Sequence, residues 1–339
     1  MALFSTFGMP TTPKISVLIP NFDCARFLPE ALDSVQAQEF ADYELIVSDD
    51  HSNDGSADLL RRRAALDPRL RLHLQSSNLG MVAHWNWCLQ QARGEYVKFV
   101  FADDALVSSQ ALGRMAALLD ANPAVSLAAS ARHVLSQDSR PIAVWDELQT
   151  AGLHRGHGVI ARCLNEDRNL IGEPSAVMFR RTAGLRGFDA RWRQLVDLEM
   201  WLHLLSSGDL AYIPEPLCAF RLHSGQQSAA NRRANVGPEE RLQLLARYIG
   251  HLPANAAGKP RSGRERRTLF RCLYHSRNYA ARTPENKAAE AGLAALLTPG
   301  WYRRYWLRHR LTKPFINLTR SIRRISGRAA PPDDALIDE

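Results

Sequence analysis

The chain has 339 residues, of which 45% are hydrophobic and 23% are charged. These values are typical of a globular protein and exclude wholesale disorder, collagen and coiled coil. Its length predicts two or three folding units, or one large domain with an extension. No run of about 18 apolar residues occurs, so no membrane-spanning helix is expected, and the N-terminus lacks the pattern of a secretory signal. Five scattered cysteines without a CxxC pair indicate a reducing compartment and neither a disulfide framework nor a zinc site.

The net charge of +8 is unevenly distributed along the chain. Residues 1–230 contain 21 Lys and Arg against 26 Asp and Glu, whereas residues 231–330 contain 22 against 5. The C-terminal third is therefore expected to meet an anionic partner. The acidic N-terminal part argues against nucleic acid as a ligand there.

Short apolar strands alternate with segments of helical spacing from residue 14 to residue 130. In chain order the predicted elements are strand 14–19, helix 27–38, strand 43–47, helix 58–66, strand 70–74, helix 81–92, strand 96–101, helix 107–119 and strand 125–130. This alternation predicts a mainly parallel α/β sheet with helices on both faces.

The regular alternation ends after residue 130. Strands are predicted at 176–180 and 211–213, around a helix at 197–206. From about residue 238 the sequence becomes helical and rich in Arg. We therefore predict a catalytic domain over 1–230, followed by a basic, mostly helical region over 231–339.

Acidic side chains follow two of the predicted strands. Asp49-Asp50 ends the second strand and Asp103-Asp104 ends the fourth, while Pro20-Asn21-Phe22 ends the first. Ligands of an open α/β sheet bind at these carboxyl ends. Adjacent carboxylates repel each other and lose hydration when they are buried. A cation would relieve this cost, and the small number of oxygen ligands favours Mg²⁺ or Mn²⁺ shared with a substrate phosphate.

Other motif readings fit less well. The segment from Asp50 begins like a calcium loop, but Arg61 stands where that loop requires a bidentate Glu. Residues 156–161 (GHGVIA) match a dinucleotide fingerprint on paper, yet no apolar strand precedes them, so a turn is expected. The sequence contains no Walker A motif and no GxSxG elbow.

Two segments resemble family 2 glycosyltransferases. They are KISVLIPNFDCARFLPEALDSVQAQEFADYELIVSDDHSNDGS and NLGMVAHWNWCLQQARGEYVKFVFADD, and the similarity extends in order over roughly residues 14–225. It implies the GT-A fold, with a donor half at about 14–130 and an acceptor half at about 131–230. The QxxRW signature of processive polymerases is absent, which favours transfer of a single sugar.

The resemblance also implies roles for matched positions. Asp50 resembles the residue that binds the nucleotide base, Asp103 the one that contacts the ribose, and Asp104 the ligand of a divalent metal. The segment VDLEMWLHL resembles the family's later acidic pattern and places the catalytic base at Asp197. In FRLHSGQQS, His223 resembles the His near the metal and diphosphate, so Asp104 and His223 are the implied metal ligands. The implied nucleotide-sugar contacts are Pro20, Asn21, Phe22, Asp50, Asn78, Gly80, Asn86 and Asp103.

Three further residues are expected on the acceptor side, namely Glu173, Ser175 and Trp201. The chain departs from the family pattern at Trp85, where Arg is common, and at Val196, where Glu is usual. Glu199 lies two residues from Asp197 and so turns away from it on a helix, which gives it a structural role.

The resemblance implies an inverting, divalent-metal-dependent glycosyltransferase. It would move one sugar from a nucleotide-diphosphate sugar to a hydroxyl of a glycan or lipid-linked acceptor, in cell-surface polysaccharide or glycolipid biosynthesis. Two alternatives remain. One is a sugar nucleotidyltransferase of related fold, although the loop PNFDCARF lacks the Gly-rich pattern of that class. The other is a non-catalytic relative that acts as a membrane-bound scaffold.

The basic segment 301–328 contains nine Lys and Arg and no acid, together with Trp301, Tyr302, Tyr305, Trp306 and Phe315. Basic residues beside interfacial aromatics favour binding to an anionic membrane surface. The alternative is a solvated helical face that packs on the catalytic domain. No recognised nucleic-acid-binding module accompanies the charge. A cytoplasmic enzyme held peripherally on the inner face of the membrane is therefore expected.

Overall fold

The computed structural model describes residues 12–307, except residues 68, 235, 255–259, 261 and 298. The chain divides into two compact units, Met1–Leu252 and Pro253–Glu339. The first unit continues past residue 230, where the sequence analysis placed a boundary, and includes helices α7 (Gln227–Arg233) and α8 (Gly237–Tyr248). Residues 308–328 of the predicted membrane-binding segment lie outside the described residues.

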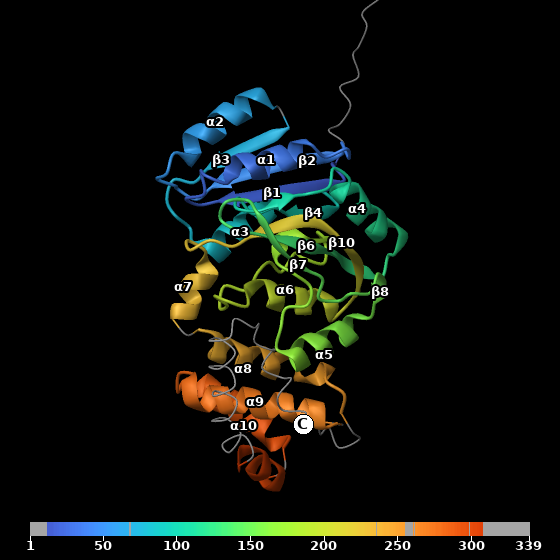
Figure 1. Cartoon of the computed structure of the whole chain (residues 1–339), viewed down its shortest axis with the longest axis vertical. Helices are drawn as coiled ribbons and strands as arrows, with labels where there is room; N and C mark the ends of the chain where they lie inside the picture. The colour runs from blue at the N-terminus through green and yellow to red at the C-terminus, as the bar shows by residue number, and fades with distance from the viewer. Residues whose placement is uncertain are drawn as a thin grey trace, which may run out of the picture. The chain divides into compact units, whose positions relative to one another are not determined.

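The predicted alternation of strands and helices is present in the first unit (Figure 1). Its N-terminal part contains β1 (Ile15–Asn21), α1 (Leu28–Gln36), β2 (Tyr43–Asp49), α2 (Ser56–Leu66), β3 (Leu70–Leu74), α3 (Met81–Gln91), β4 (Tyr96–Phe99), β5 (Ala105–Leu106) and α4 (Ala111–Ala121). The elements that follow are β6 (Val125–Leu135), β7 (Pro141–Trp145), β8 (Gly152–His154), α5 (Gly156–Glu166), η1 (Pro174–Ala176), β9 (Val177–Arg180), α6 (Val196–Leu205), β10 (Asp209–Arg221), α7, α8 and η2 (Ile249–His251).

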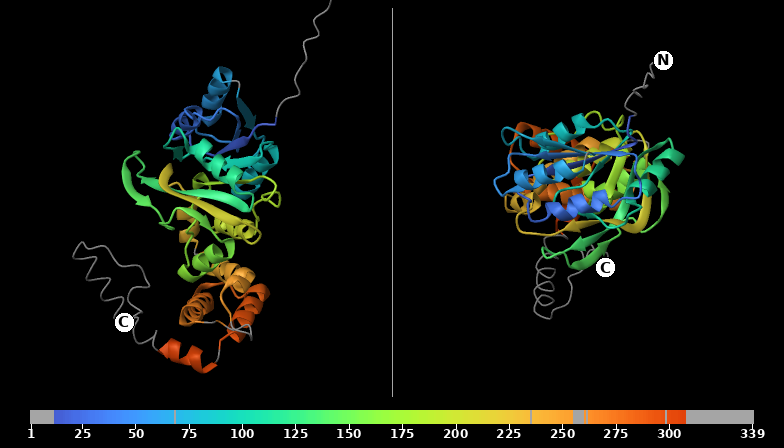
Figure 2. Two further views of the ribbon diagram at one scale, coloured as in Figure 1. Left: turned by 90° about the vertical axis from the view of Figure 1, so that its right-hand side faces the viewer. Right: turned by 90° about the horizontal axis from the view of Figure 1, so that it is seen from above.

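The described strands form one mixed sheet in the order β3-β2-β1-β4-β9-β6-β10-β5. The first four of these strands are parallel, as expected for strands joined by helical crossovers. β9 lies antiparallel between β4 and β6, and β10 runs parallel to β6. β7 forms an antiparallel hairpin with β6, seen in green in the left view of Figure 2.

Helices cover both faces of the sheet, as predicted. One face packs against α1, α2 and α4 around a core that includes Val17, Leu32 and Met115, and the right-hand view of Figure 2 shows α1 and α2 in blue on the near side. On the other face, Trp201 of α6 packs against Phe179 of β9, with ring centroids 5.8 Å apart. Because β1 and β2 are buried along their whole length, the site at their ends is fixed to a rigid support.

The second half of the unit differs most from the sequence prediction. β6 and β10 extend well beyond the predicted strands 125–130 and 211–213, and β7 and β8 were not predicted. β7 is largely exposed, so it lacks the alternating apolar pattern that marks a half-buried strand. The helix predicted at 107–119 begins later than expected. Residues 105–106 form strand β5, and α4 begins at Ala111.

The expectation of a turn at residues 156–161 was wrong, because they form the first part of helix α5. The glycine that imitated a dinucleotide fingerprint has a packing role instead. A Cβ atom on Gly156 would lie 2.1 Å from the carbonyl oxygen of Gly208 and 2.3 Å from that of Leu205. Only glycine allows α5 to approach the end of α6 this closely.

The second unit is helical in its described part. Helix α9 (Gly263–Tyr279) begins with a capping box between Ser262 and Glu265. Its Ser276 hydroxyl donates a 2.6 Å hydrogen bond to Glu290 of α10 (Pro284–Ala295). Residues 299–307 are also helical, and within them Trp301 stacks on Tyr305 with ring centroids 4.8 Å apart.

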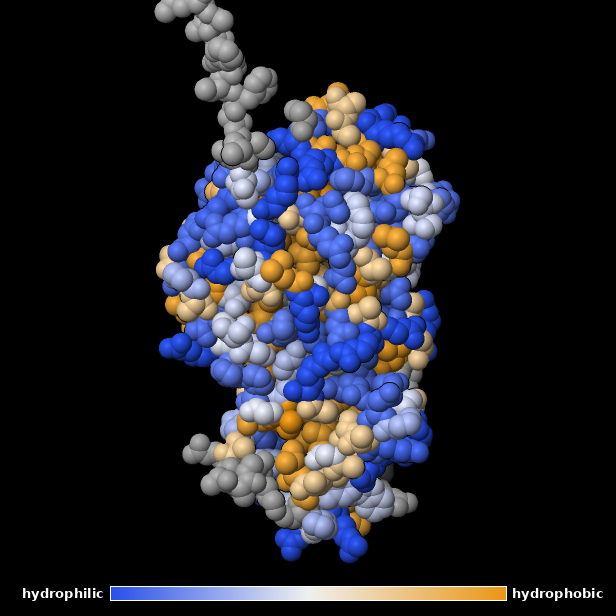
Figure 3. All heavy atoms as spheres, turned by 180° about the vertical axis from the view of Figure 1, so that it is seen from behind, coloured by the Kyte–Doolittle hydropathy of each residue, from blue (hydrophilic) through white to orange (hydrophobic). Residues whose placement is uncertain are grey.

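Among the described helices, none has the length and apolarity needed to cross a bilayer. The molecular face in Figure 3 has hydrophobic side chains set among hydrophilic ones.

The close contact at the start of α5 leads to a stability prediction. The substitution Gly156→Ala should lower the free energy of unfolding by about 2 kcal/mol, the usual cost of forcing an extra methyl group into packed structure. The matched control is Gly158→Ala in the same helix, where an added Cβ meets nothing within 4 Å. This change should raise stability by about 0.5 kcal/mol, because alanine is the better helix former. Urea unfolding of both variants measures the difference, and equal effects would contradict the packing role of Gly156.

Candidate active site

The ends of β1 and β2 lie side by side, with Asn21 opposite Asp49 in the register. The Asn21 amide donates a 2.6 Å hydrogen bond to the Asp49 carboxylate. The hydroxyl of Ser52 accepts hydrogen bonds from Asn21 and from the backbone N–H of Asp23. Asp49 and Ser52 thus join the loop after β2 to the loop after β1. Phe22, in the loop after β1, is exposed.

The predicted base-binding residue Asp50 is almost fully buried. Its two carboxylate oxygens accept hydrogen bonds from the backbone N–H groups of Leu79 and Gly80, at 2.8 and 3.0 Å. The Asn78 side chain donates to the carbonyl oxygen of Asp50 at 3.1 Å. Gly80 has a φ of 83°, a value that favours glycine. Asp50 therefore holds the loop 78–80 beside the end of β2, so the structure gives it a positioning role.

The second acidic pair follows β4 and is held by β10. Asp104 is 1% exposed, and its Oδ1 atom accepts a 3.1 Å hydrogen bond from the backbone N–H of Arg221. Its Oδ2 atom is buried and accepts no hydrogen bond of ordinary geometry. Burial, reinforced by the negative charge of Asp103, raises the pKa of Asp104 well above its usual range, although the nearby Ser175 hydroxyl lowers the pKa of this carboxyl somewhat. A buried carboxylate oxygen without such a hydrogen bond is costly unless a further group binds it.

His223 contacts the neighbouring acid, Asp103. Its Nε2 atom lies 2.9 Å from Asp103 Oδ2, and its ring packs on Phe27 with centroids 5.0 Å apart. The sequence analysis paired His223 with Asp104 as metal ligands, whereas this structure pairs it with Asp103. Within the described residues, no group of three or more His, Cys, Asp or Glu side chains is placed to hold a metal ion by itself.

Arg221 was missed by the sequence analysis, although it stands two residues before His223. The side chain is fully buried. It donates to the carbonyl oxygen of Asp103 at 2.8 Å, to the hydroxyl of Ser139 at 2.6 Å and to the carboxylate of Glu30 at 2.7 Å. Arg221 thereby ties the acidic loop after β4 to α1 and to the β6–β7 turn.

Asp197, the predicted base, lies in the first turn of α6. Its Oδ2 atom accepts a 3.1 Å hydrogen bond from the amide of Asn169, a residue that sequence reasoning did not identify. Burial and then the charge of Glu173 raise the pKa of Asp197 to about 7, while Arg132 acts in the opposite direction. Glu173 in turn forms a 2.5 Å ion pair with Arg132. A carboxylate with this pKa can accept a proton near neutral pH.

Two residues expected on the acceptor side are buried. Trp201 is fully enclosed and its indole donates a 2.9 Å hydrogen bond to the carbonyl oxygen of Gly172. The hydroxyl of Ser175 accepts from the backbone N–H of Phe101 at 3.0 Å, and its carbonyl accepts from buried Lys98. Both residues shape the loop around Glu173, and neither presents surface to an acceptor in this conformation.

Asn86, expected to contact the nucleotide sugar, also has a tethering role here. Its amide donates to the carbonyl oxygen of Phe188 at 2.8 Å and accepts from the N–H of Phe188 at 2.7 Å. Trp85, on the same helix, packs between Phe101 and Phe188 with centroid distances of 4.7 and 5.3 Å. Both side chains connect α3 to the segment that precedes α6.

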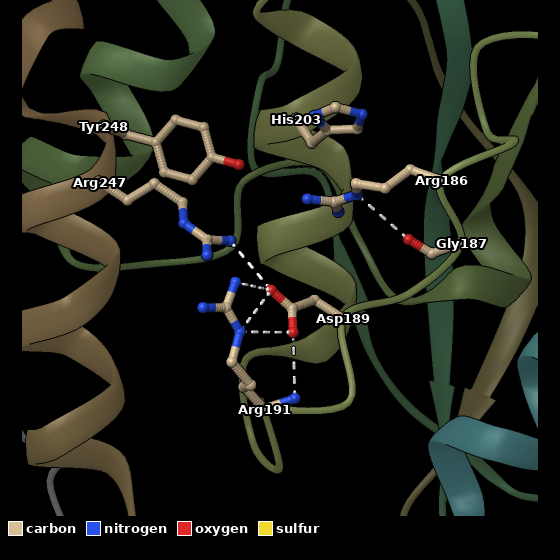
Figure 4. A pocket seen from close by; sticks show the side chains of 7 residues that line it. All are labelled: Arg186, Gly187, Asp189, Arg191, His203, Arg247 and Tyr248. Carbon is tan, nitrogen blue, oxygen red and sulfur yellow. Dashed lines mark hydrogen bonds and ion pairs between the residues drawn. The ribbon is translucent and has the colours of Figure 1, made fainter.

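Glu199 is fully buried on the side of α6 away from solvent, and it has the structural role that the sequence analysis assigned to it. It accepts hydrogen bonds from Arg186, from Arg247 and from the hydroxyl of Tyr248. These partners line a cavity of about 590 Å³, in which Asp189 lies between Arg191 and Arg247 (Figure 4). The network holds α6, and with it Asp197, against α8.

Comparisons with known proteins agree with this architecture. Residues 16–180 match the model of the family described as Glycosyl transferase family 2. The chain is 34% identical over 245 residues to an uncharacterized protein, MT1568, of Mycobacterium tuberculosis, covering 69% of this chain and 75% of that protein. The chain belongs to glycosyltransferase family 2. It is thus a glycosyltransferase enzyme, and the nucleotidyltransferase and scaffold readings are not favoured.

A further relative is similar over a shorter stretch. It is the GalNAc(5)-diNAcBac-PP-undecaprenol beta-1,3-glucosyltransferase of Campylobacter jejuni, 39% identical over 97 residues, which are 28% of this chain and 31% of that enzyme.

Solved structures confirm the GT-A fold. TarS of S. aureus, crystallised as residues 1–349 with UDP-GlcNAc, superposes with a TM-score of 0.58 at 17% identity. The superposition covers 83% of this chain and 79% of the TarS chain. The mannosyltransferase PcManGT of Pyrobaculum calidifontis, in complex with GDP-Man and Mn²⁺, gives a TM-score of 0.56 at 20% identity. The superposition covers 91% of this chain and 84% of the PcManGT chain. At these identities the likeness concerns the fold.

Proposed function

We propose that this family 2 enzyme is an inverting, divalent-metal-dependent transferase of single sugars. The donor is a nucleotide-diphosphate sugar, and the acceptor is a hydroxyl of a glycan or lipid-linked molecule in cell-surface polysaccharide or glycolipid biosynthesis. The observation that carries the proposal is the presence of two separate acidic positions. They are the buried Oδ2 of Asp104, which accepts no hydrogen bond of ordinary geometry, and the carboxylate of Asp197 with a pKa of about 7. The first suits a cation on a donor phosphate, and the second suits an acceptor proton.

The residues at the end of β4 fit a divalent cation. Asp104 offers a buried carboxylate oxygen that accepts no hydrogen bond of ordinary geometry, and hard oxygen ligands suit Mg²⁺ and Mn²⁺. In the proposal Asp104 would hold the metal, and His223, which contacts Asp103 beside it, would be the second protein ligand. When bound, such a cation would neutralise the charge that develops on the leaving diphosphate. The Mn²⁺ in the complex of PcManGT supports this assignment.

The donor nucleotide is proposed to lie across the ends of β1, β2 and β4. Its contacts would come from Pro20, Asn21 and Phe22 of the first loop and from Asp103. Asp50, Asn78 and Gly80 contribute through the shape of the loop 78–80, because the carboxylate of Asp50 is already hydrogen-bonded to that loop. UDP-GlcNAc with TarS and GDP-Man with PcManGT support a nucleotide-sugar donor and leave the base open.

Asp197 is the proposed general base. It would take the proton of the acceptor hydroxyl while the oxygen attacks the anomeric carbon and the nucleoside diphosphate leaves with the bonding electrons. Displacement in one step inverts the anomeric centre. A retaining double displacement needs a carboxylate nucleophile, and Glu199 is unavailable because Arg186, Arg247 and Tyr248 occupy its oxygens. The product anomer, read by NMR, reports the stereochemistry.

Membrane association is proposed for the basic C-terminal region, on the cytoplasmic side. The charge of residues 301–328 supports it. A lipid-linked acceptor would lie at the same surface, and the GalNAc(5)-diNAcBac-PP-undecaprenol beta-1,3-glucosyltransferase supports an acceptor of that kind.

The base assignment predicts the behaviour of Asp197→Asn. This variant should bind nucleoside diphosphates as the wild type does but transfer sugar on the order of 10²–10⁴-fold more slowly, because the amide cannot accept the proton. Asp58→Asn is the matched control, since Asp58 is an exposed residue paired with Arg61 on α2, and it should keep full activity. Turnover is measured as nucleoside diphosphate release from a panel of nucleotide sugars with glycan and lipid-linked acceptors. Full turnover by Asp197→Asn would contradict the assignment.

The pH dependence of activity is a second test of Asp197 as the base. Activity should fall as the pH drops through about 7, because Asp197 becomes protonated. Glu173→Gln removes a negative charge that raises this pKa and frees Arg132, which lowers it. The acidic limb of kcat should therefore move to lower pH in this variant. An unchanged limb would show that another group controls it.

The membrane proposal is tested by flotation of the intact protein with vesicles. We expect flotation with vesicles that contain phosphatidylserine at low salt, and loss of flotation at high salt because surface charges are screened. Phosphatidylcholine vesicles are the control and should leave the protein at the bottom of the gradient. Absence of binding to the anionic vesicles, or equal binding to both kinds, would refute an electrostatic membrane contact.

A further inference from the structure

A cavity of about 490 Å³ lies beside Asp197 and has no part in the donor site. Its wall includes Asn169, which is hydrogen-bonded to Asp197 at 3.1 Å, and Glu173, whose charge acts on Asp197. The volume falls within the range of small-ligand sites. A molecule in this cavity would therefore be next to the proposed base.

The wall contains one aromatic side chain, Trp145, at the end of the exposed strand β7. The indole is partly exposed, although its neighbours hold it in place. The Arg132 guanidinium lies 5.1 Å from the ring centroid, and Phe220 packs against the ring at 5.7 Å with an interplanar angle of 32°. A fixed, partly exposed aromatic ring provides a flat apolar surface at little entropic cost.

Apart from Val144, the rest of the wall is polar, and each of its two arginines is paired with a glutamate. Arg132 pairs with Glu173 and Arg168 pairs with Glu147, each at 2.5 Å. The carboxylate of Asp146 accepts from the hydroxyl of Tyr212 at 2.8 Å and from the N–H of Gln149 at 2.9 Å. These groups are fixed donors and acceptors with little net charge among them. Such a wall disfavours both a free anion and a lipid chain, and it suits a neutral molecule with many hydroxyl groups.

We propose that this cavity binds the pyranose ring that carries the attacking hydroxyl, with the apolar C–H face of the ring on Trp145. Hydroxyl groups on the ring edge hydrogen-bond to Glu173 and Arg132. The inference rests on the proposed function and specifies its acceptor as a sugar ring. In the reaction the ring's hydroxyl oxygen forms the new bond to the anomeric carbon, its proton moves to Asp197, and the bond from that carbon to the diphosphate breaks. Trp145 then determines acceptor specificity.

The test is ligand-observed saturation-transfer NMR with wild type and variants of Trp145. The probes are methyl β-D-glucopyranoside, methyl β-D-galactopyranoside and methyl N-acetyl-β-D-glucosaminide, with sorbitol as a polyol without a ring face and inorganic phosphate as an anion. We expect at least one pyranoside to bind wild type, with saturation strongest on its C–H face and no binding of sorbitol or phosphate in this cavity. Trp145→Ala should weaken that binding by about tenfold, whereas Trp145→Phe should retain most of it.

Two further variants separate stacking from folding. Trp145→Leu keeps apolar bulk against Phe220 but lacks a flat face, so it should lose pyranoside binding even if Trp145→Ala is unstable. Ile142→Ala is the matched control, because Ile142 lies on the same strand, is 57% exposed and does not line the cavity. It should bind as wild type does.

Nucleotide binding, measured by thermal shift on the same samples, distinguishes the two possible failures. If wild type binds nucleoside diphosphates but no pyranoside, or if the leucine and alanine variants bind pyranosides as tightly as wild type, the sugar subsite is overturned while the proposed function stands. If pyranosides bind in a Trp145-dependent way but no nucleotide binds, the cavity is still a sugar-binding site, but the proposed function fails and with it the role of the bound ring as acceptor.

Discussion

A buried acid, Asp104, is the physical constraint on which the arrangement at the end of β4 depends. Asp104 is buried, and its Oδ2 atom accepts no hydrogen bond of ordinary geometry. Burying a carboxyl group in this way lowers the stability of the fold, because the group loses its hydration. Hydrogen bonds from a neighbouring arginine hold the acidic loop in this position. Arg221, itself fully buried, holds the loop of Asp103 and connects it to Glu30 and Ser139. This buried acid is the ground for the cation site proposed at the end of β4.

A second acid, Asp197 at the start of α6, is also desolvated but has different neighbours. Glu173 lies near it. Burial raises the pKa of both Asp104 and Asp197, that of Asp197 to about 7. The difference is that Oδ2 of Asp197 accepts a hydrogen bond from Asn169. Glu199, only two residues further on, is buried with Arg186 and Arg247 as ion-pair partners and anchors the helix. The three acids thus have three different surroundings, from which the proposed roles of Asp104 and Asp197 are inferred.

Much of the donor half could be predicted because its information is local. Buried parallel strands give short, largely apolar runs such as 15–19 and 45–47, and the acidic pairs stand shortly after the second and fourth of these strands. The rest depends on contacts between distant segments. Arg221 meets Glu30 across the fold, Trp201 is enclosed by residues far from α6 in the sequence, and the exposed strand β7 has no alternating pattern. No local signal marks Trp145 or Asn169 as parts of a site, since each gains its position from the fold.

The measurement that tests the central claim most directly is a thermal-shift panel of UDP, GDP, dTDP and CMP, each with and without Mn²⁺, on wild type and Asp104→Asn. A ligand at about 100 times its Kd stabilises the protein by about 2.7 kcal/mol, which is readily detected. The account predicts that one nucleotide stabilises wild type strongly only when Mn²⁺ is present, and that Asp104→Asn loses this metal-dependent shift. Stabilisation that is independent of metal and unchanged in the variant would contradict the role of Asp104, and absence of any shift in wild type would contradict the donor site itself.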